Sequence, residues 1–387
     1  MEPYGEPNFP KYLRYRAVSV LLITLFTSCI TRLDIEPSDF EEYLVVEGFI
    51  NNDPGPHEFR ITRVSRFTGV MDGGAITTTE ARVHITDQNG LSIPLERKPA
   101  VRKEVYNASP GGCAPAVAFV QVQTNYRTPE GFRGVRGNTY TLEIQTPDGK
   151  VYRSEPQTLR ATPALDSLHL EFSELPSLDP VIIPSGIEIL ATWQDPPRER
   201  NYYFWIINGI YRINTSENGS PGQCCLFDPT DGGARFCWIY ENDLPDNELA
   251  FSDARVDGQL ITRPVGFIED DGLRFVGDQL PADKQYYIEV EQYAMSKEAF
   301  EFNERIKVLA GIDGDIFDPP PLSIRGNIYN IADPEEIVIG HFGAYEVQKR
   351  DIFVPASLLK FRQRYPEPCG DCRVRAGAQL ETPEPFR

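Results

Sequence analysis

Hydrophobic and polar residues alternate with a period of two along much of this chain. Five short runs show the pattern, at residues 43–50, 58–64, 81–87, 139–145 and 151–154. Clusters of Gly, Pro, Asn and Asp follow them, as in Asn51-Asn52-Asp53-Pro54-Gly55. Such alternation, punctuated by turn residues, is typical of strands with one buried face. We therefore predict an immunoglobulin-like β-sandwich over residues 41–160, with a long loop carrying Cys113 between residues 98 and 137.

A second β-rich unit is predicted over residues 161–360. Alternating runs recur at residues 168–172, 187–193 and 286–293, and the nearly all-apolar run 202–207 is typical of a central strand buried on both faces. This pattern indicates a fibronectin type III-like sandwich, in which residues 214–282 form a long, loop-rich insertion. The fold class is therefore all-β, with two β-sandwich domains.

One short helix is expected directly after Ser296, whose side chain can cap it. Ala299, Phe300, Asn303, Ile306 and Val308 supply an approximately helical face. The tail, residues 361–387, is rich in Pro and Gly and is predicted to pack as an ordered loop held by its cysteines.

The first 28 residues have the pattern of a bacterial lipoprotein signal peptide. Lys11, Arg14 and Arg16 precede an apolar run at residues 17–26, which ends in Phe26-Thr27-Ser28-Cys29. The run is too short to span a bilayer, so we predict cleavage before Cys29, which would carry diacylglycerol and palmitate. The alternative is a secretory signal followed by an unrelated cysteine. If Cys29 is lipidated, residues 29–40 form a polar tether between the lipid and the first strand.

Charge and composition narrow the function. The formal net charge is −19, without a basic block, which argues against binding to nucleic acid. There is no nucleophile elbow, phosphate-binding glycine loop or metalloprotease helix motif, so we predict no catalytic residue, no cofactor and no metal site. His341 is predicted to be a packed histidine at a sheet edge. Paired carboxylates are interpreted as a solvated, negative surface; they are Asp195, Asp253, Asp257, Glu269, Asp270 and Asp271.

Three further carboxylates, Asp313, Asp315 and Asp318, follow the helix and could hold calcium. Their segment lacks the glycine and the bidentate Glu of an EF-hand loop, so a simple turn is the stronger interpretation.

Six cysteines remain besides Cys29, namely Cys113, Cys224, Cys225, Cys237, Cys369 and Cys372. An even number in an exported chain favours disulfides. The favoured bonds are Cys369–Cys372 and Cys237 with Cys224 or Cys225, which leaves Cys113 for the other member of that pair. Cys369 and Cys372 could instead form half of a zinc ribbon, but no second pair has the matching spacing.

Aromatic residues in the expected insertion are candidates for binding a partner protein, because such side chains often anchor interfaces. They are Phe236, Trp238, Tyr240 and Phe251. The alternative is that these rings build the insertion's own small core.

The chain resembles the Bacteroidota lipoproteins of domain of unknown function 4249. The resemblance rests on Cys29 with residues 43–48, residues 187–196 ending in Trp193-Gln194-Asp195-Pro196, residues 292–300, residues 317–344 and the Cys369-x-x-Cys372-Arg373 ending. In that family Tyr is common at position 341, and Phe386 matches an aromatic residue that often ends the tail. The resemblance implies an outer-membrane lipoprotein, often encoded beside a TonB-dependent receptor, and no known catalytic residue.

From these observations we expect a non-enzymatic outer-membrane lipoprotein that is an accessory or ligand-binding partner of a TonB-dependent transporter. A structural or assembly factor of the envelope is the alternative, and a hydrolase is a weaker one that rests on the carboxylates alone. An aromatic-lined groove in the insertion would favour binding of a nutrient, whereas a flat apolar patch would favour a protein partner. A buried carboxylate pair in a cleft would favour an enzyme.

Overall fold

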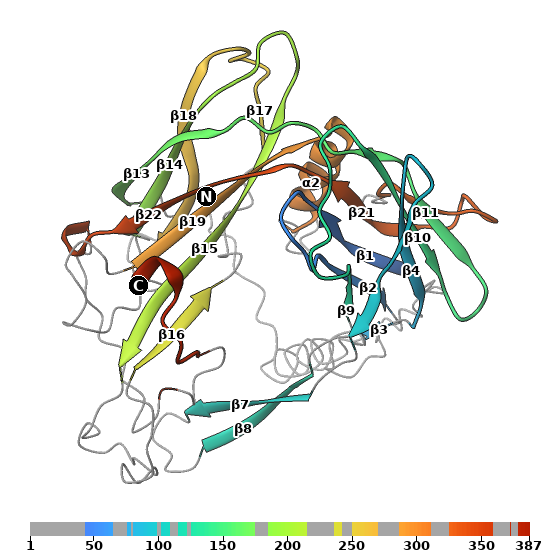
Figure 1. Cartoon of the computed structure of the whole chain (residues 1–387), viewed down its shortest axis with the longest axis horizontal. Coiled ribbons are helices and arrows are strands. Elements are labelled where there is room, and N and C mark those ends of the chain that lie inside the picture. Colours follow the sequence, from blue (N-terminus) through green and yellow to red (C-terminus); the bar gives the residue numbers. More distant parts are fainter. Residues whose placement is uncertain are drawn as a thin grey trace, which may run out of the picture. The chain divides into compact units, whose positions relative to one another are not determined.

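The computed structural model describes most of the chain between residues 43 and 387. The described residues are 43–64, 76–78, 80–98, 102–108, 115–121, 125–174, 185–214, 236–241, 250–269, 286–310, 325–358, 372 and 378–387. Strands dominate them, as the alternating sequence predicts (Figure 1). They pack around two large hydrophobic cores, and a smaller apolar cluster includes Tyr293, Ala299 and Tyr345.

The first core lies between two antiparallel-rich sheets. One sheet has the order β21 (Val338–Ala344), β1 (Tyr43–Ile50), β2 (Glu58–Val64), β9 (Asn125–Arg127) and β6 (Glu96–Lys98), with β3 (Ile76–Thr78) also paired to β2. The other has the order β20 (Ile328–Asn330), β11 (Val151–Ser154), β10 (Thr139–Gln145), β4 (Arg82–Asp87) and β5 (Ser92–Pro94), with β12 (Gln157–Thr158) beside β10. Alternate residues such as Leu44, Val46 and Ile50 face this core, which confirms the predicted sandwich.

Two of these strands come from far along the sequence. β20 and β21 close one edge of each sheet, and β21 runs parallel to β1. The sequence-based boundaries assigned residues 328–344 to the second sandwich, and that assignment is wrong. Local alternation identifies a strand but not its neighbour, because pairing partners are chosen by the global packing.

The second core lies between a three-stranded and a larger sheet. The first has the order β13 (Leu165–Glu174), β14 (Ser185–Gln194) and β18 (Leu260–Glu269). The second has the order β16 (Phe236–Glu241), β15 (Tyr202–Asn214), β19 (Tyr286–Met295) and β22 (Val347–Val354), with β17 (Phe251–Ser252) beside β15. Trp193 and Trp205 fill this core, and β15 is the central strand that residues 202–207 predict.

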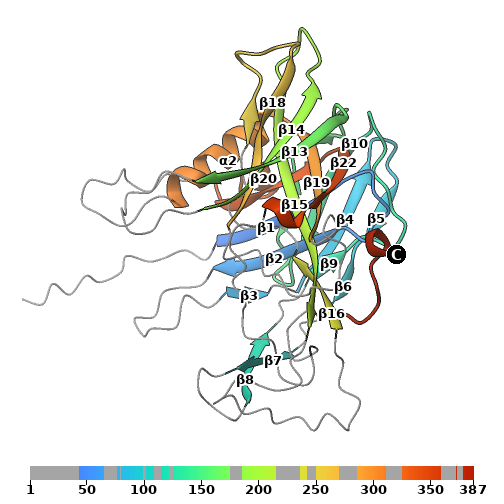
Figure 2. The same cartoon turned by 90° about the vertical axis from the view of Figure 1, so that its left-hand side faces the viewer.

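The segments expected to be irregular contain strands. β16, β17 and β18 all fall within residues 214–282, and β16 and β18 form sheet edges, so the described part of this region is not a loop-rich appendage. Similarly, β7 (Arg102–Ala108) and β8 (Pro115–Gln121) form a hairpin within the expected loop (Figure 2). Cys113 lies outside the described residues.

The predicted helix is α2 (Lys297–Ala310), directly after β19. The backbone N–H of Ala299 donates to Ser296 Oγ at 3.2 Å, which confirms the cap. Ala299 and Phe302 are buried, so this face of the helix packs against the sheets. No helix within the described ranges is both long and apolar enough to cross a bilayer.

The short turns η2 (Ala356–Leu358) and η4 (Glu384–Phe386) complete the described C-terminal part. Phe386 packs against Trp238, with ring centroids 4.4 Å apart, and Gln379 exchanges two backbone hydrogen bonds with Trp238. The end of the tail therefore lies along β16, as the prediction of an ordered tail requires.

The two sandwiches belong to one compact unit, Glu42–Arg387. The chain passes between them near Thr162 and again near Glu346. The buried Glu346 carboxylate accepts hydrogen bonds from Thr162 N at 2.8 Å and from Arg136 Nε at 3.0 Å. Thr162 Oγ1 donates to the Glu346 carbonyl and accepts from Ala294 N. These bonds hold the two connections together at the junction of the sandwiches.

Candidate ligand-binding site

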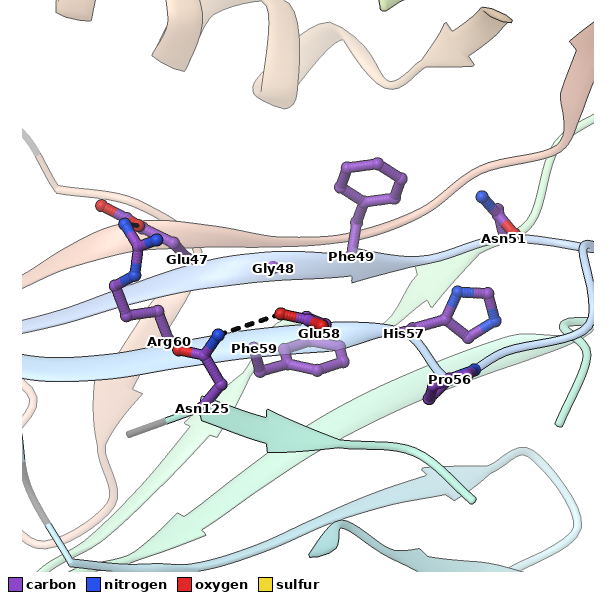
Figure 3. Close-up of a pocket in the computed structure, with 10 residues that line it drawn as sticks. All are labelled: Glu47, Gly48, Phe49, Asn51, Pro56, His57, Glu58, Phe59, Arg60 and Asn125. Carbon is purple, nitrogen blue, oxygen red and sulfur yellow. Dashed lines mark hydrogen bonds and ion pairs between the residues drawn. The ribbon is translucent and has the colours of Figure 1, made fainter. Parts of the chain in front are cut away.

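The outward face of β1 carries two neighbouring cavities. Because side chains alternate along a strand, Val46 and Ile50 enter the first core while Glu47 and Phe49 point away from it. Glu47, Gly48 and Phe49 line both cavities. Figure 3 shows Phe49 projecting from β1 on the side of the helix, away from the strand that carries His57 and Glu58.

The first cavity, of about 410 Å³, lies over β1, β2 and β9 and is mainly polar at its rim. Glu58 accepts a hydrogen bond from Asn125 Nδ2 at 2.9 Å (Figure 3). Arg60 donates to Glu47 at 2.9 Å. Burial lowers the pKa of His57, which packs edge-on against Phe132. Glu47 and Arg60 are paired with each other, as are Glu58 and Asn125 Nδ2. His57 Nε2 and Asn125 Oδ1 are buried and have no hydrogen-bond partner in the described part of the chain, so this cavity also offers unpaired polar atoms.

The second cavity, of about 320 Å³, lies at the junction of the sandwiches, and we call it the junction cavity. Its walls come from β1, β15, β21 and α2. Five of its fourteen lining residues are aromatic, namely Phe49, Phe204, Trp205, Phe302 and Tyr345. The volume and the apolar lining are those of a site for a small ligand.

The rings of the junction cavity are held rigidly by one another. Phe204 stacks on Tyr293 with centroids 4.7 Å apart, and Tyr345 lies edge-on to Phe204 at 5.3 Å. Phe49 contacts Tyr345 at 5.5 Å. Offset and edge-on contacts of this kind stabilise aromatic clusters beyond the area that they bury. The cavity wall is therefore preformed.

His341 is the polar group that stands out in the junction cavity. It lies on β21, the edge strand of its sheet, as the sequence predicts, and its ring packs 5.8 Å from that of Phe302. Its Nε2 atom is buried and has no hydrogen-bond partner in the described part of the chain. Burial lowers the pKa of His341 to about 4, although the negative charge of Glu298 acts in the opposite direction. The imidazole is therefore neutral at pH 7, with one nitrogen available to a ligand.

A glycine next to His341 positions the strand. Gly340 has φ +128°, and a Cβ atom there would lie 1.9 Å from the carbonyl oxygen of Val46. Only glycine permits this close approach of β21 to β1. The approach places His341 opposite Glu47 in the strand register, at the cavity wall.

Two of the predicted surface carboxylates are buried instead. Asp195 is 0% exposed and Asp253 is 1% exposed, so the prediction of a solvated surface is wrong for these residues, whereas Asp257 is exposed. They are buried because backbone and side-chain donors surround them where β14 ends and β18 begins. None of the three lines either cavity.

The cysteine pairings predicted from sequence separation are wrong. Cys237 on β16 is bonded to Cys372, with Cα atoms 5.7 Å apart and a sequence separation of 135. The tail reaches β16 through its backbone pairing at Trp238, and this brings the two sulfurs together. Cys372 is therefore not bonded to Cys369, and Cys237 is not bonded to Cys224 or Cys225.

Several predicted site residues lie outside the described residues. They are Cys29, Cys113, Cys224, Cys225, Cys369, Asp270, Asp271, Asp313, Asp315 and Asp318.

Of the four aromatic partner candidates, Phe236, Trp238 and Tyr240 lie at alternate positions of β16, whereas Phe251 lies on β17. Phe236 pairs with Asn214 at one end of β15, and Phe251 pairs with Tyr203 near the other. At about 3.3 Å per residue, these two positions on β15 are about 35 Å apart.

Each end of β15 has its own packing. Arg212 lies 5.0 Å over the Phe236 ring and 5.9 Å from Trp238, and Trp238 is covered by Phe386. Phe251 packs on Trp193 and Arg263. Phe236 is 40% exposed, so it is the ring of the four that stays most available to a partner.

The fold and the junction cavity together define an all-β protein of two sandwiches with an aromatic site between them. The family comparison agrees with the resemblance noted in the sequence. The chain belongs to the family described as domain of unknown function (DUF4249), whose model matches residues 30–351. The comparison with curated proteins gives no match for this chain.

Proposed function

We propose that this protein is a non-enzymatic outer-membrane lipoprotein that acts as an accessory or ligand-binding partner of a TonB-dependent transporter. The observation that carries the binding role is the junction cavity, with its aromatic walls and the unpaired Nε2 of His341. An apolar ligand with one hydroxyl or amine donor would fill it and satisfy this nitrogen.

The polar side of the junction cavity narrows the ligand class. Glu47, Asn303 and Lys307 lie on its lining together with His341, while the rest is mostly aromatic and aliphatic. A ligand with an apolar body and a polar end matches this division. Burying a polar end without partners would cost about 1–3 kcal/mol, so these side chains give specificity.

The location in the outer membrane rests on the sequence. The charged start, the short apolar run and Cys29 support export and lipidation. The resemblance noted in the sequence implies a protein that is often encoded beside a TonB-dependent receptor, and this supports a partner of that class. A lipid at Cys29 would hold the cavity-bearing sandwiches close to a barrel in the same membrane.

Two alternatives differ in what they require. A structural or assembly factor would use an exposed apolar surface, for which Phe236 and Leu260 are candidates. A hydrolase would need its carboxylates in a cleft, and the buried pair Asp195 and Asp253 lines neither cavity, which supports binding over hydrolysis.

The anchor is tested with labelled palmitate. We expect the wild type to incorporate the label and Cys29→Ala to lose both the label and its place in the membrane fraction. Equal labelling of the two proteins would refute lipidation at this residue.

The partner role is tested by purifying the full chain from outer membranes in mild detergent. A TonB-dependent barrel should co-purify with the wild type, and organic extraction should release a small apolar molecule from the protein. Phe204→Ala should reduce the amount of extracted molecule, whereas Leu380→Ala, an exposed change in the tail, should not. Absence of a barrel from the wild-type preparation would end the transporter proposal, and equal extraction from all three proteins would end the assignment of the cavity.

A further inference from the structure

A group of three acidic residues that do not line the junction cavity lies in the second sandwich. Asp195 directly follows β14, Asp253 directly follows β17, and Asp257 lies in the turn before β18. One carboxylate oxygen from each residue lies within 4.8 Å of the other two. Three separate segments of the chain therefore bring their negative charges to one point.

Hydrogen bonds fix the orientation of each carboxylate. Asp195 Oδ1 accepts from Tyr203 Oη at 2.6 Å, and Asp195 Oδ2 accepts from Gly258 N at 2.9 Å. Asp253 Oδ2 accepts from Asn201 N at 2.8 Å and from Asn201 Nδ2 at 3.1 Å.

Asp257 is held in the same way, because its Oδ1 accepts from Arg198 N at 2.9 Å. All these donors are neutral. Within the described ranges, no Lys, Arg or His side chain forms an ion pair with any of the three carboxylates.

An independent observation points to a missing partner. Asp253 is 1% exposed, and its Oδ1 atom is buried with no hydrogen-bond donor in the described part of the chain. A buried carboxylate oxygen without a partner is costly and uncommon in folded proteins. Because the other oxygen of the same carboxylate is saturated by Asn201, rotation of the side chain would only exchange one unpaired oxygen for another.

We propose that Asp195, Asp253 and Asp257 form a binding site for one divalent cation, with calcium as the ion of best fit. Calcium binds oxygen ligands at 2.3–2.6 Å, so two ligands of one ion lie at most about 5 Å apart, as these carboxylate oxygens do. Calcium also accepts irregular ligand sets, whereas magnesium demands near-ideal octahedral geometry.

The cluster combines two buried carboxylates with one exposed carboxylate. Asp257 is exposed, so an ion can enter from solvent and keep water among its ligands.

Terbium luminescence provides a direct test on the full chain. Tyr203 donates to Asp195, and the Trp193 ring lies 5.4 Å from that of Tyr203, so both rings are close enough to sensitise a lanthanide bound by the carboxylates. We expect sensitised terbium emission from the wild type and its displacement by calcium chloride. Asp253→Asn and Asp257→Asn should each lose most of the emission, whereas Asp166→Asn, an exposed change in β13, should retain it.

Thermal unfolding gives a second readout. At about ten times the dissociation constant, calcium should raise the wild-type melting temperature by about 2–4 °C relative to a sample in chelator. Asp257→Asn should lose this shift, and because its side chain is exposed it tests the site even where Asp253→Asn fails to fold. A wild type without a calcium shift, or variants with the wild-type shift and emission, would overturn the proposal. Stability that follows pH alone would also overturn it and would assign a shared proton to the carboxylates instead.

Discussion

His341 should make this protein lose stability in mild acid. Its pKa is about 4 in the folded protein, whereas an exposed histidine has a pKa of 6.5. Because the folded-state pKa is the lower one, the unfolded chain binds the proton first as the pH falls. The stability is fully present above pH 6.5 and is lost between pH 6.5 and 4.

The size of the loss follows from the two pKa values. At about pH 5 the histidine is almost fully protonated in the unfolded chain and mostly neutral in the folded one, which corresponds to about 2 kcal/mol. The limit below the folded-state pKa is about 3 kcal/mol. Both figures depend on the burial of the ring beside Phe302 in the junction cavity.

Urea unfolding of the wild type and of His341→Phe at about pH 7.5 and about pH 5 isolates this effect. Phenylalanine fits among the aromatic rings and cannot be protonated, so the variant should lose about 2 kcal/mol less than the wild type between the two pH values. His169→Gln is the matched control, because His169 lies on β13 with its side chain 70% exposed, and it should follow the wild type.

Two results would refute the reasoning. The first is the same pH dependence for the wild type and His341→Phe. The second is an NMR titration of the His341 ring with a midpoint near that of an exposed histidine, which would mean that water or an acceptor reaches Nε2 and stabilises its protonated form.

Two further predictions concern the covalent and ionic ties of the fold. Cys237→Ser should lower the free energy of unfolding by about 3 kcal/mol, because the bond to Cys372 closes a long loop. Peptide mapping without reduction should find the Cys237 and Cys372 peptides linked. Separate peptides would contradict the pairing. In urea unfolding, Glu346→Leu should lower the free energy of unfolding by about 2–4 kcal/mol, because Thr162 N would remain buried without an acceptor. Glu346→Gln keeps an acceptor, so its loss should be about half as large. Equal losses for the two variants would refute this account.

The strands with clean alternation were predictable almost to the residue. β1, β2, β10 and β11 have the bounds that the sequence indicates, and Ser296 caps the helix as expected. In each of these cases the signal is local, since it depends on side-chain period and on turn or capping residues. The family match agrees with the resemblance found in short sequence segments.

The predictions that were wrong concern features that depend on segments far apart in the sequence. β21 pairs in parallel with β1 across nearly 300 residues of sequence, and the residues of neither strand identify its pairing partner. The disulfide has the same origin, because Cys372 is placed by the tail's path along β16. The burial of the acidic residues was predicted wrongly for a related reason. Burial depends on which backbone donors surround a carboxylate. The donor to Asp195 from Gly258 comes from a segment more than sixty residues away in the sequence.

The junction cavity shows why a binding site can be absent from the sequence pattern and still be well formed. Its strand walls are mostly the outward faces of strands whose inward faces build the two cores, so most of these lining residues have the ordinary alternation of a strand; Trp205 belongs both to the cavity and to the second core. Two of the points where the chain passes between the sandwiches, at Thr162 and at Glu346, are joined because the Glu346 carboxylate accepts hydrogen bonds from Thr162 and Arg136. Two connections joined by a buried carboxylate restrict rotation of one sandwich against the other more than a single linker would. A ligand would therefore meet a site whose shape is already set, so little of its binding free energy would be spent on ordering the protein.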